Sequence, residues 1–150
     1  MRAAEAGRYA SDLNMPNEYK SSWWAVELPL DWSAEEKDGC VTLSAKQGVG
    51  ALQISTYRRD GEPVPDEDLY DFAEDELVDG ALPQNVSYGD FRGIACSYVA
   101  DERFWRKLWL RLGSLLLYVT YNCRAEDQAV EVESVNRMLN SLQSRISGEA

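Results

Sequence analysis

The sequence predicts an α+β fold in which an antiparallel sheet is packed between helices. One supporting feature is a pair of strand-like runs, residues 104–112 and 115–123, that flank Gly113-Ser114 and are apolar on both sides. Another is a pair of segments, about residues 66–79 and 126–145, whose apolar residues recur at helical spacing. A sheet that is apolar on both faces has to be covered on both, and the two helices are the expected covers.

A two-residue turn at Gly113-Ser114 fixes the register of the hairpin and so decides which residues share a face. One face, called face A below, is almost wholly apolar and carries Phe104, Leu108, Leu110, Leu112, Leu115, Leu117, Val119 and Cys123. The opposite face, face B, is aromatic with a cationic stripe and carries Trp105, Lys107, Trp109, Arg111, Leu116, Tyr118, Thr120 and Asn122. The hairpin is therefore expected to form the core of the fold.

Residues 91–100 extend this pattern if Asp101-Glu102 turns the chain, although that pair is unfavourable in a two-residue hairpin turn. Gly93 then lies opposite Leu110, and Ala95 lies opposite Leu108, both on face A. Their small side chains, with that of Ser97, leave room for a helix to approach. The expected occupant of this space is the helix at 126–145.

Shorter strands are expected on both sides of the first helix. Residues 23–28 alternate and end at Pro29, and a second strand follows near Trp32. Alternating apolar residues predict two more strands, at 41–45 and 51–58, and a further strand is expected near 86–88.

The two predicted helices each have one apolar face. In the first it comprises Leu69, Phe72, Ala73 and Leu77, with Gly80 as the stop signal, and in the second it comprises Val132, Val135, Leu139, Leu142 and Ile146. The expected organisation is a polar N-terminal arm at 1–21, one domain at 22–146 and a tail at 147–150.

Composition restricts the function classes. The chain has 150 residues and a formal net charge of −11, which argues against binding to nucleic acid or to an anionic membrane. The acidity fits a basic protein partner, or it simply keeps the protein soluble. The three cysteines, Cys40, Cys96 and Cys123, are far apart, so neither a disulfide framework nor a zinc site is expected. With neither a signal peptide nor a membrane span, the sequence predicts a cytoplasmic protein.

The chain contains no histidine, which excludes Ser-His-Asp triads, Cys-His dyads and imidazole metal sites. Paired carboxylates at Glu67, Asp71 and Asp75 lack the spaced oxygens of a calcium loop and are interpreted as a solvated helix face. The glycines of GDFRG and KQGVG match no phosphate-binding loop. We therefore predict no catalytic residues, no metal and no cofactor.

One constellation on face B is a candidate partner-binding site: Trp105, Lys107, Trp109, Arg111 and Tyr118. Tryptophan, tyrosine and arginine dominate the binding energy of protein interfaces. The alternative is that the helix at 66–79 covers the tryptophans, while Lys107 and Arg111 extend to solvent.

The order of elements resembles the PsbP-like (Mog-like) α/β/α superfamily over about residues 22–146. The resemblance rests on local phrases at Leu28–Trp32, Gly39–Leu43, Ala51–Ser55, Asp66–Leu69, Trp105–Trp109 and Leu115–Cys123. It implies a curved antiparallel sheet of about six or seven strands with helices packed on both faces, an α/β/α sandwich. It also implies a binding protein, because members include a photosystem assembly subunit, a binder of a small nuclear GTPase and adaptors for secreted effectors. The superfamily has no common active site to transfer.

The first functional hypothesis is a non-enzymatic interaction module: an adaptor, chaperone or immunity-type protein that could serve a secreted effector, with another protein, basic in character, as its partner. The alternative is a small-molecule binding domain with an aromatic pocket lined by Trp23, Trp105 or Tyr118. An enzyme that uses carboxylates or tyrosine ranks third.

Overall fold

The computed structural model describes residues 17–59, 62–74 and 82–145. The first sixteen residues of the predicted arm, the predicted helix positions Leu77 and Gly80, Ile146 and the C-terminal tail lie outside these residues.

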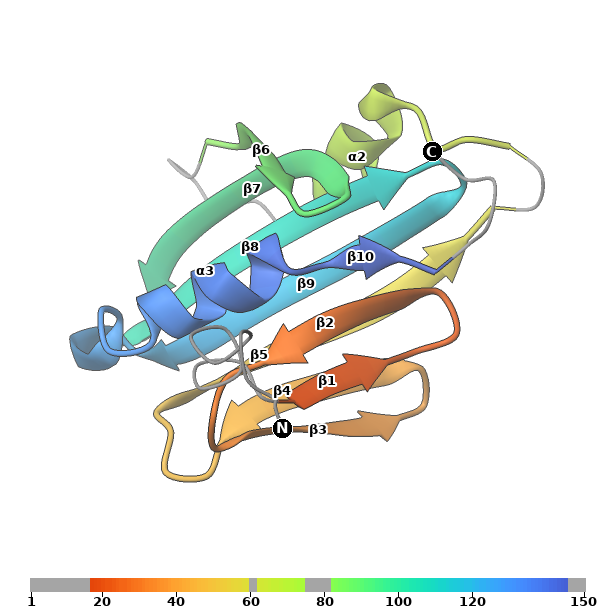
Figure 1. The fold of residues 1–150 in the computed structure, drawn as a ribbon. Coiled ribbons are helices and arrows are strands. Elements are labelled where there is room, and N and C mark those ends of the chain that lie inside the picture. The colour runs from red at the N-terminus through yellow and green to blue at the C-terminus, as the bar shows by residue number, and fades with distance from the viewer. Residues whose placement is uncertain (1–16, 60–61, 75–81, 146–150) are drawn as a thin grey trace, which may run out of the picture.

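The described chain forms two antiparallel sheets. The larger has seven strands in the order β3-β4-β5-β9-β8-β7-β6, and the smaller has three in the order β1-β2-β10 (Figure 1). The strands of the large sheet are β3 (Trp32–Lys37), β4 (Cys40–Ala45), β5 (Gly50–Arg58), β6 (Gln84–Tyr88), β7 (Phe91–Ala100), β8 (Arg103–Leu112) and β9 (Leu115–Arg124). Those of the small sheet are β1 (Asn17–Lys20), β2 (Trp24–Leu28) and β10 (Gln143–Ser144). The helices are α2 (Asp66–Ala73), the 3-10 turn η2 (Ala125–Asp127) and α3 (Val132–Asn140).

The predicted register of the central hairpin is confirmed. Leu110 pairs with Leu117, Trp109 pairs with Tyr118, and the other predicted pairs follow the same register. Gly93 pairs with Leu110, as predicted from a turn at residues 101–102. That turn forms because Asp101 and Glu102 both adopt left-handed backbone conformations, with φ of 53° and 63°. Two such residues match the twist of the flanking strands, and aspartate is among the residues that tolerate this region.

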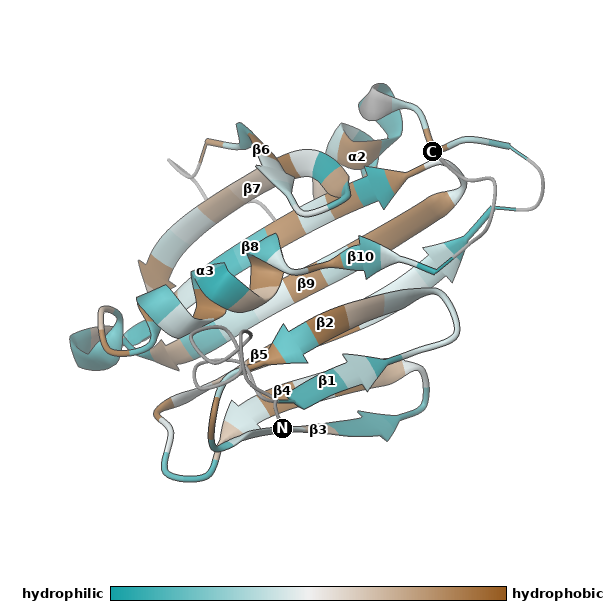
Figure 2. Ribbon diagram, in the orientation of Figure 1, coloured by the Kyte–Doolittle hydropathy of each residue, from teal (hydrophilic) through white to brown (hydrophobic). Residues whose placement is uncertain are grey.

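Face A is covered mainly by the small sheet. Trp24, Val26 and Leu28 of β2 are buried in one cluster with the face A leucines of β8 and β9. Helix α3 lies beside this sheet, contacts β2, and adds Val135, Met138 and Leu139 to the same cluster. Figure 2 shows apolar residues along β2, β8 and β9, whereas α3 presents hydrophilic residues on its outer side.

Face B is covered differently. Leu69 and Ala73 of α2, with Val64, pack on Ile94, Cys96, Trp109 and Leu116 to form a second, smaller core cluster. In the described part of the chain α2 has eight residues and contacts β7 and β8, so it lies over one end of the sheet.

The predicted α/β/α sandwich is therefore wrong. The fold is mostly sheet, and helices do not pack over both faces, because a second sheet occupies most of face A. The small sheet was missed because its outer strands carry little pattern. β1 reads Asn-Glu-Tyr-Lys and is largely exposed, and β10 has only two residues. Both strands pair with β2, whose own alternation was recognised, and such tertiary pairing is invisible to local periodicity.

The helix predicted at 126–145 is also too long. The chain there forms η2, then α3 from Val132 to Asn140, and then β10. Ser141 ends the helix, because its hydroxyl donates to the Met138 carbonyl at 2.7 Å and accepts from the Glu27 backbone N–H at 2.8 Å. Val132, expected on the apolar stripe, is 45% exposed. The predicted helix at 66–79 ends at Ala73 as an α-helix, and Phe72, expected on its buried face, is 49% exposed.

Candidate functional site

The five predicted partner-binding residues share face B, but they differ in burial. Trp109 is 2% exposed and Lys107 is 9% exposed, so neither projects from the surface. Trp105, Arg111 and Tyr118 are half-buried. Two of the five predicted residues are therefore buried, and the other three are only partly accessible.

Lys107 does not extend to solvent as the alternative interpretation predicted. Its ammonium nitrogen lies 5.2 Å from the ring centroid of Trp105 and 5.5 Å from that of Tyr98. A cation over aromatic faces is attracted by their negative π-clouds, and this attraction is stronger when water is excluded. The lysine thus joins the two rings on neighbouring strands.

An open apolar groove of about 310 Å³ lies beside this layer, lined by Tyr57, Phe72, Trp109, Leu116 and Tyr118. Trp109 and Leu116 are buried and form its floor. The rings of Trp109 and Tyr118 lie 5.5 Å apart and are tilted by 31°, which holds the floor in a fixed shape. Tyr57 and Phe72 are 56% and 49% exposed, so two large rings stand accessible at the rim.

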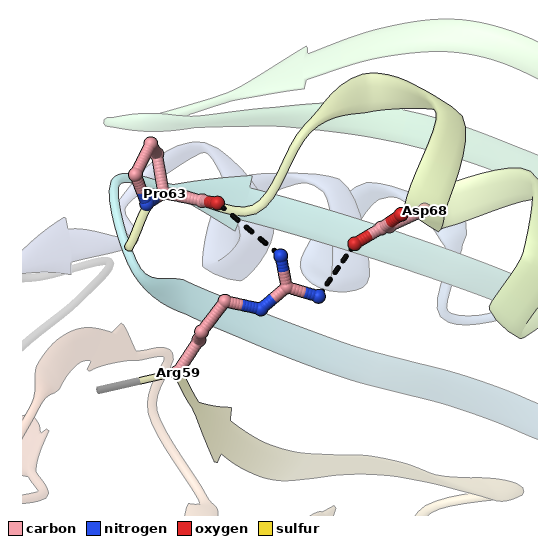
Figure 3. A network of polar contacts seen from close by, with 3 residues as sticks. All are labelled: Arg59, Pro63 and Asp68. Atoms are coloured by element: carbon pink, nitrogen blue, oxygen red, sulfur yellow. Dashed lines mark hydrogen bonds and ion pairs between the residues drawn. The ribbon is translucent and has the colours of Figure 1, made fainter. Parts of the chain in front are cut away.

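The groove exists because α2 is fixed against one end of the sheet. Arg59, just after β5, donates to Asp68 of α2 at 2.5 Å and to the Pro63 carbonyl at 3.5 Å (Figure 3). The Val64 N–H donates to the Gly113 carbonyl at 2.8 Å, which attaches the start of the helix to the β8–β9 turn. These contacts place Phe72 of α2 near Tyr57 of β5.

Tyr57 and Phe72 were missed as candidate residues. Tyr57 could have been found, because alternation from Leu52 and Ile54 puts it on the opposite face, and it pairs with Leu116 of face B. Phe72 could not, because its exposure depends on how α2 rotates onto Ile94 and Trp109. That rotation buries Leu69 and Ala73 instead.

The helix that carries Phe72 is acidic on its exposed side. Glu67, Asp71 and Glu74 are all exposed. Glu67 and Asp71 are thus solvated as the sequence predicted, next to the apolar groove, whereas the third predicted carboxylate, Asp75, lies outside the described residues. Within the described residues, no group of three or more potential ligands could hold a metal ion.

A second polar cluster joins α3 to the large sheet. The Glu131 side chain, 7% exposed, accepts from the Tyr121 hydroxyl at 2.7 Å and from the backbone N–H groups of Val49 and Gly50 at 3.1 Å and 3.2 Å. Burial and the hydrogen bond to Glu131 raise the pKa of Tyr121 far above its ordinary value. A tyrosine that holds its proton so firmly is a poor general acid, and near neutral pH it has no ionised form to act as a base. The cluster is a structural clamp between the 46–49 turn and the start of α3.

The raised pKa of Tyr121 predicts a loss of stability at alkaline pH. Above about pH 10 the tyrosine of the unfolded chain loses its proton while the folded protein keeps it. The unfolded state then binds fewer protons, so stability falls with pH by about 1.4 kcal/mol per unit from this group. Urea unfolding at about pH 9 and about pH 11 measures this effect. Between these two pH values, the free energy of unfolding should fall less for Tyr121→Phe than for the wild type. Tyr70→Phe, an exposed control, should follow the wild type, and equal slopes for all three proteins would contradict the assignment.

The two other predicted pocket residues lie apart from the groove. Trp23 lines a separate hollow with Tyr19 and Glu36, and the Arg58 guanidinium lies 4.6 Å from its ring centroid. Trp105 packs against Lys107. Only Tyr118 of the three lines the groove.

The comparisons with known proteins found similarity in fold alone. No family model matches the sequence, and no curated protein matches it. A crystal structure from Bacteroides thetaiotaomicron VPI-5482 is similar, with a TM-score of 0.68 and 16% identity over 91% of this chain and 50% of that chain. This chain thus spans half the length of that protein. LpqN of Mycobacterium tuberculosis, described as involved in cell envelope biogenesis, has a TM-score of 0.60 and 14% identity over 91% of this chain and 94% of its own.

These two structures assign the chain to a class of proteins by its fold alone. Identities of 14% and 16% carry no site residue from one protein to another. Among the described residues, no helix is both long enough and apolar enough to cross a bilayer.

Proposed function

We propose that this chain is a non-enzymatic protein-interaction module of the adaptor, chaperone or immunity type. Its face B groove receives an apolar anchor side chain from a basic segment of a partner protein. The observation that carries the proposal is the pair of exposed rings, Tyr57 and Phe72, at the rim of a groove floored by the buried Trp109. An anchor that fills such a pocket and excludes water typically supplies about 2 kcal/mol or more of binding energy.

Charge favours a basic partner. The exposed carboxylates of Glu67, Asp71 and Glu74 lie on the helix that carries Phe72, and the whole chain has a net charge of −11. Such a field speeds the encounter with a cationic segment and disfavours an acidic one. In this proposal the groove supplies most of the affinity, and the acidic side of α2 selects for basic partner segments.

A random peptide library displayed on phage tests this proposal. Selected peptides are expected to carry a tryptophan, phenylalanine or leucine flanked by lysine or arginine. Tyr57→Ser and Phe72→Ser should each weaken binding of a selected peptide about ten-fold or more. Leu30→Ser, which removes a 63% exposed leucine outside the groove, is the matched control and should leave binding unchanged.

Two results would overturn the proposal. One is a library that yields no enriched peptide. The other is a peptide that binds folded Phe72→Ser and Tyr57→Ser as tightly as it binds the wild type. Both rim residues are about half-exposed, so these variants are expected to fold, and far-ultraviolet circular dichroism would verify it.

The alternative function, a small-molecule binding domain, is favoured by Tyr118 in the groove lining. For the face B groove it ranks below protein binding. Small-molecule sites typically combine apolar walls with several converging polar groups. The groove lining contributes only tyrosine hydroxyls and the tryptophan N–H as side-chain polar groups.

Membership of the PsbP-like superfamily and the absence of enzymatic activity stay predictions. A cytoplasmic location is our proposal, because all three cysteines are free. The competing location is the cell envelope, with which the description of LpqN associates that protein. Fractionation of the native host decides between them.

A further inference from the structure

A second cleft, of about 590 Å³, lies on face A at the edge of α3, on the opposite side of the large sheet from the groove. Its lining includes Ala95 and Ser97 of β7, Phe104 and Arg106 of β8, and Val132 and Asn136 of α3. A volume of this size is typical of small-molecule sites.

The cleft is the space that the small side chains of β7 leave open. Ala95 and Ser97 were expected to admit a close helix, yet α3 packs beside β2 and buries Val135, Met138 and Leu139 there. Its other side, with Val132 and Asn136, borders the cleft instead of filling it. Part of the cleft is therefore a gap between two layers of the fold.

Arg106 is a cation without an anionic partner in the described part of the chain. Its guanidinium donates to the Tyr88 hydroxyl at 2.7 Å, and its central carbon lies 5.7 Å from the centroid of that ring. Among the described residues that line the cleft there is no aspartate or glutamate. A half-buried guanidinium held by a neutral hydroxyl has donors left for a planar anion, which carboxylates match with two parallel hydrogen bonds.

Asn136 supplies a second unsatisfied group. Its side-chain oxygen is buried and accepts no hydrogen bond from the residues that the structure describes. Leaving such an acceptor unpaired typically costs about 1–3 kcal/mol, so a rotation of the Asn136 amide that brings this oxygen to an N–H or O–H donor of a bound ligand would recover this energy. The lining is mixed: Val86 and Phe104 supply apolar surface, whereas Gln84 and Ser97 supply further polar groups.

We propose that this cleft binds an N-acylated apolar amino acid through its free carboxylate. The carboxylate pairs with Arg106, and the apolar side chain packs on Phe104 and Val86. The amide N–H donates to the Asn136 side-chain oxygen once that side chain has turned toward the cleft. The same chemistry occurs in a free metabolite and at the C-terminus of a peptide. This inference is independent of the face B groove, so each can fail without the other.

The test uses N-acetyl-L-phenylalanine, its neutral C-terminal amide, and acetyl-Ser-Gly-Gly-Phe, each titrated into the full chain and followed by nitrogen-15 NMR. The free acid is expected to bind with a Kd on the order of 1 mM and to shift the amides of Ala95, Ser97 and Asn136. The neutral amide should bind about ten-fold more weakly or worse. Equal binding of the tetrapeptide would indicate a peptide C-terminus, and its exclusion would indicate a free metabolite.

Arg106→Met should reduce binding about ten-fold or more, whereas Arg137→Met, which removes an exposed arginine from α3, should leave it unchanged. The proposal fails if the cleft amides do not shift, if acid and amide bind equally, or if folded Arg106→Met binds like the wild type. The comparison of N-acetyl-L-phenylalanine with its amide uses the wild-type chain. It therefore tests the proposal even if Arg106→Met does not fold.

Discussion

Replacing Gly93 by alanine is expected to lower the free energy of unfolding by at least about 3 kcal/mol, near the upper end of what one methyl group does in a packed interior. A Cβ at this position would overlap the Trp109 carbonyl oxygen, and it would lie 2.9 Å from the Trp109 carbonyl carbon and 3.0 Å from the Leu110 Cα. All three are backbone atoms of β8, so no side-chain rotation relieves the clash.

The neighbouring strand cannot move away at low cost. β8 pairs on its other side with β9 along its whole length, and both faces of the sheet are packed at this point. Separating β7 from β8 would break the ladder hydrogen bonds or open a cavity on one face. Gly93→Val, with two more methyl groups, should not reach the native fold.

Urea unfolding followed by circular dichroism measures the effect of Gly93→Ala. Ser97→Val is the matched control, because Ser97 lies on the same strand and the same face but is exposed. It should change the free energy of unfolding by no more than about 0.5 kcal/mol. Equal urea midpoints for Gly93→Ala and the wild type would show that β7 and β8 are not packed this closely.

Gly93 also shows how far local pattern could predict this fold. Alternation assigned its partner, Leu110, correctly although Asp101-Glu102 is an unfavourable turn pair, because a register shift of one residue would have moved every apolar side chain of face A to face B. The same reasoning expected a helix above the small residues of β7. It could not reveal a three-stranded sheet, because nothing in Asn17–Lys20 shows that it will pair with Trp24–Leu28.

Local sequence pattern likewise predicted one part of the candidate site and missed another. Register alone placed Trp105, Lys107 and Trp109 together on face B. Whether each side chain is exposed depended on where α2 lies, and that is set by contacts between distant residues, such as those of Arg59 with Asp68 and Val64 with Gly113. Tyr57 and Phe72, at the rim of the groove, follow from those contacts and not from the hairpin.

Replacing Glu131 by alanine is expected to cost about 3–5 kcal/mol, because each buried donor left unpaired typically costs about 1–3 kcal/mol. The substitution leaves three donors without their acceptor: the Tyr121 hydroxyl and the N–H groups of Val49 and Gly50. Domains of this size are typically stable by about 5–15 kcal/mol, so the loss is a large part of the total.

Two variants separate the polar contacts from the packing around Glu131. Glu131→Gln keeps one acceptor oxygen and should lose only about 1–2 kcal/mol. In Glu131→Ala/Tyr121→Phe the unpaired hydroxyl is gone, so the double variant should lose less than the sum of the two single losses. Glu133→Ala, which truncates an exposed glutamate two residues away, should change stability by no more than about 0.5 kcal/mol. If Glu131→Ala unfolds at the same urea concentration as Glu133→Ala, the carboxylate does not hold the 46–49 turn to α3, because the three donors then find water without cost.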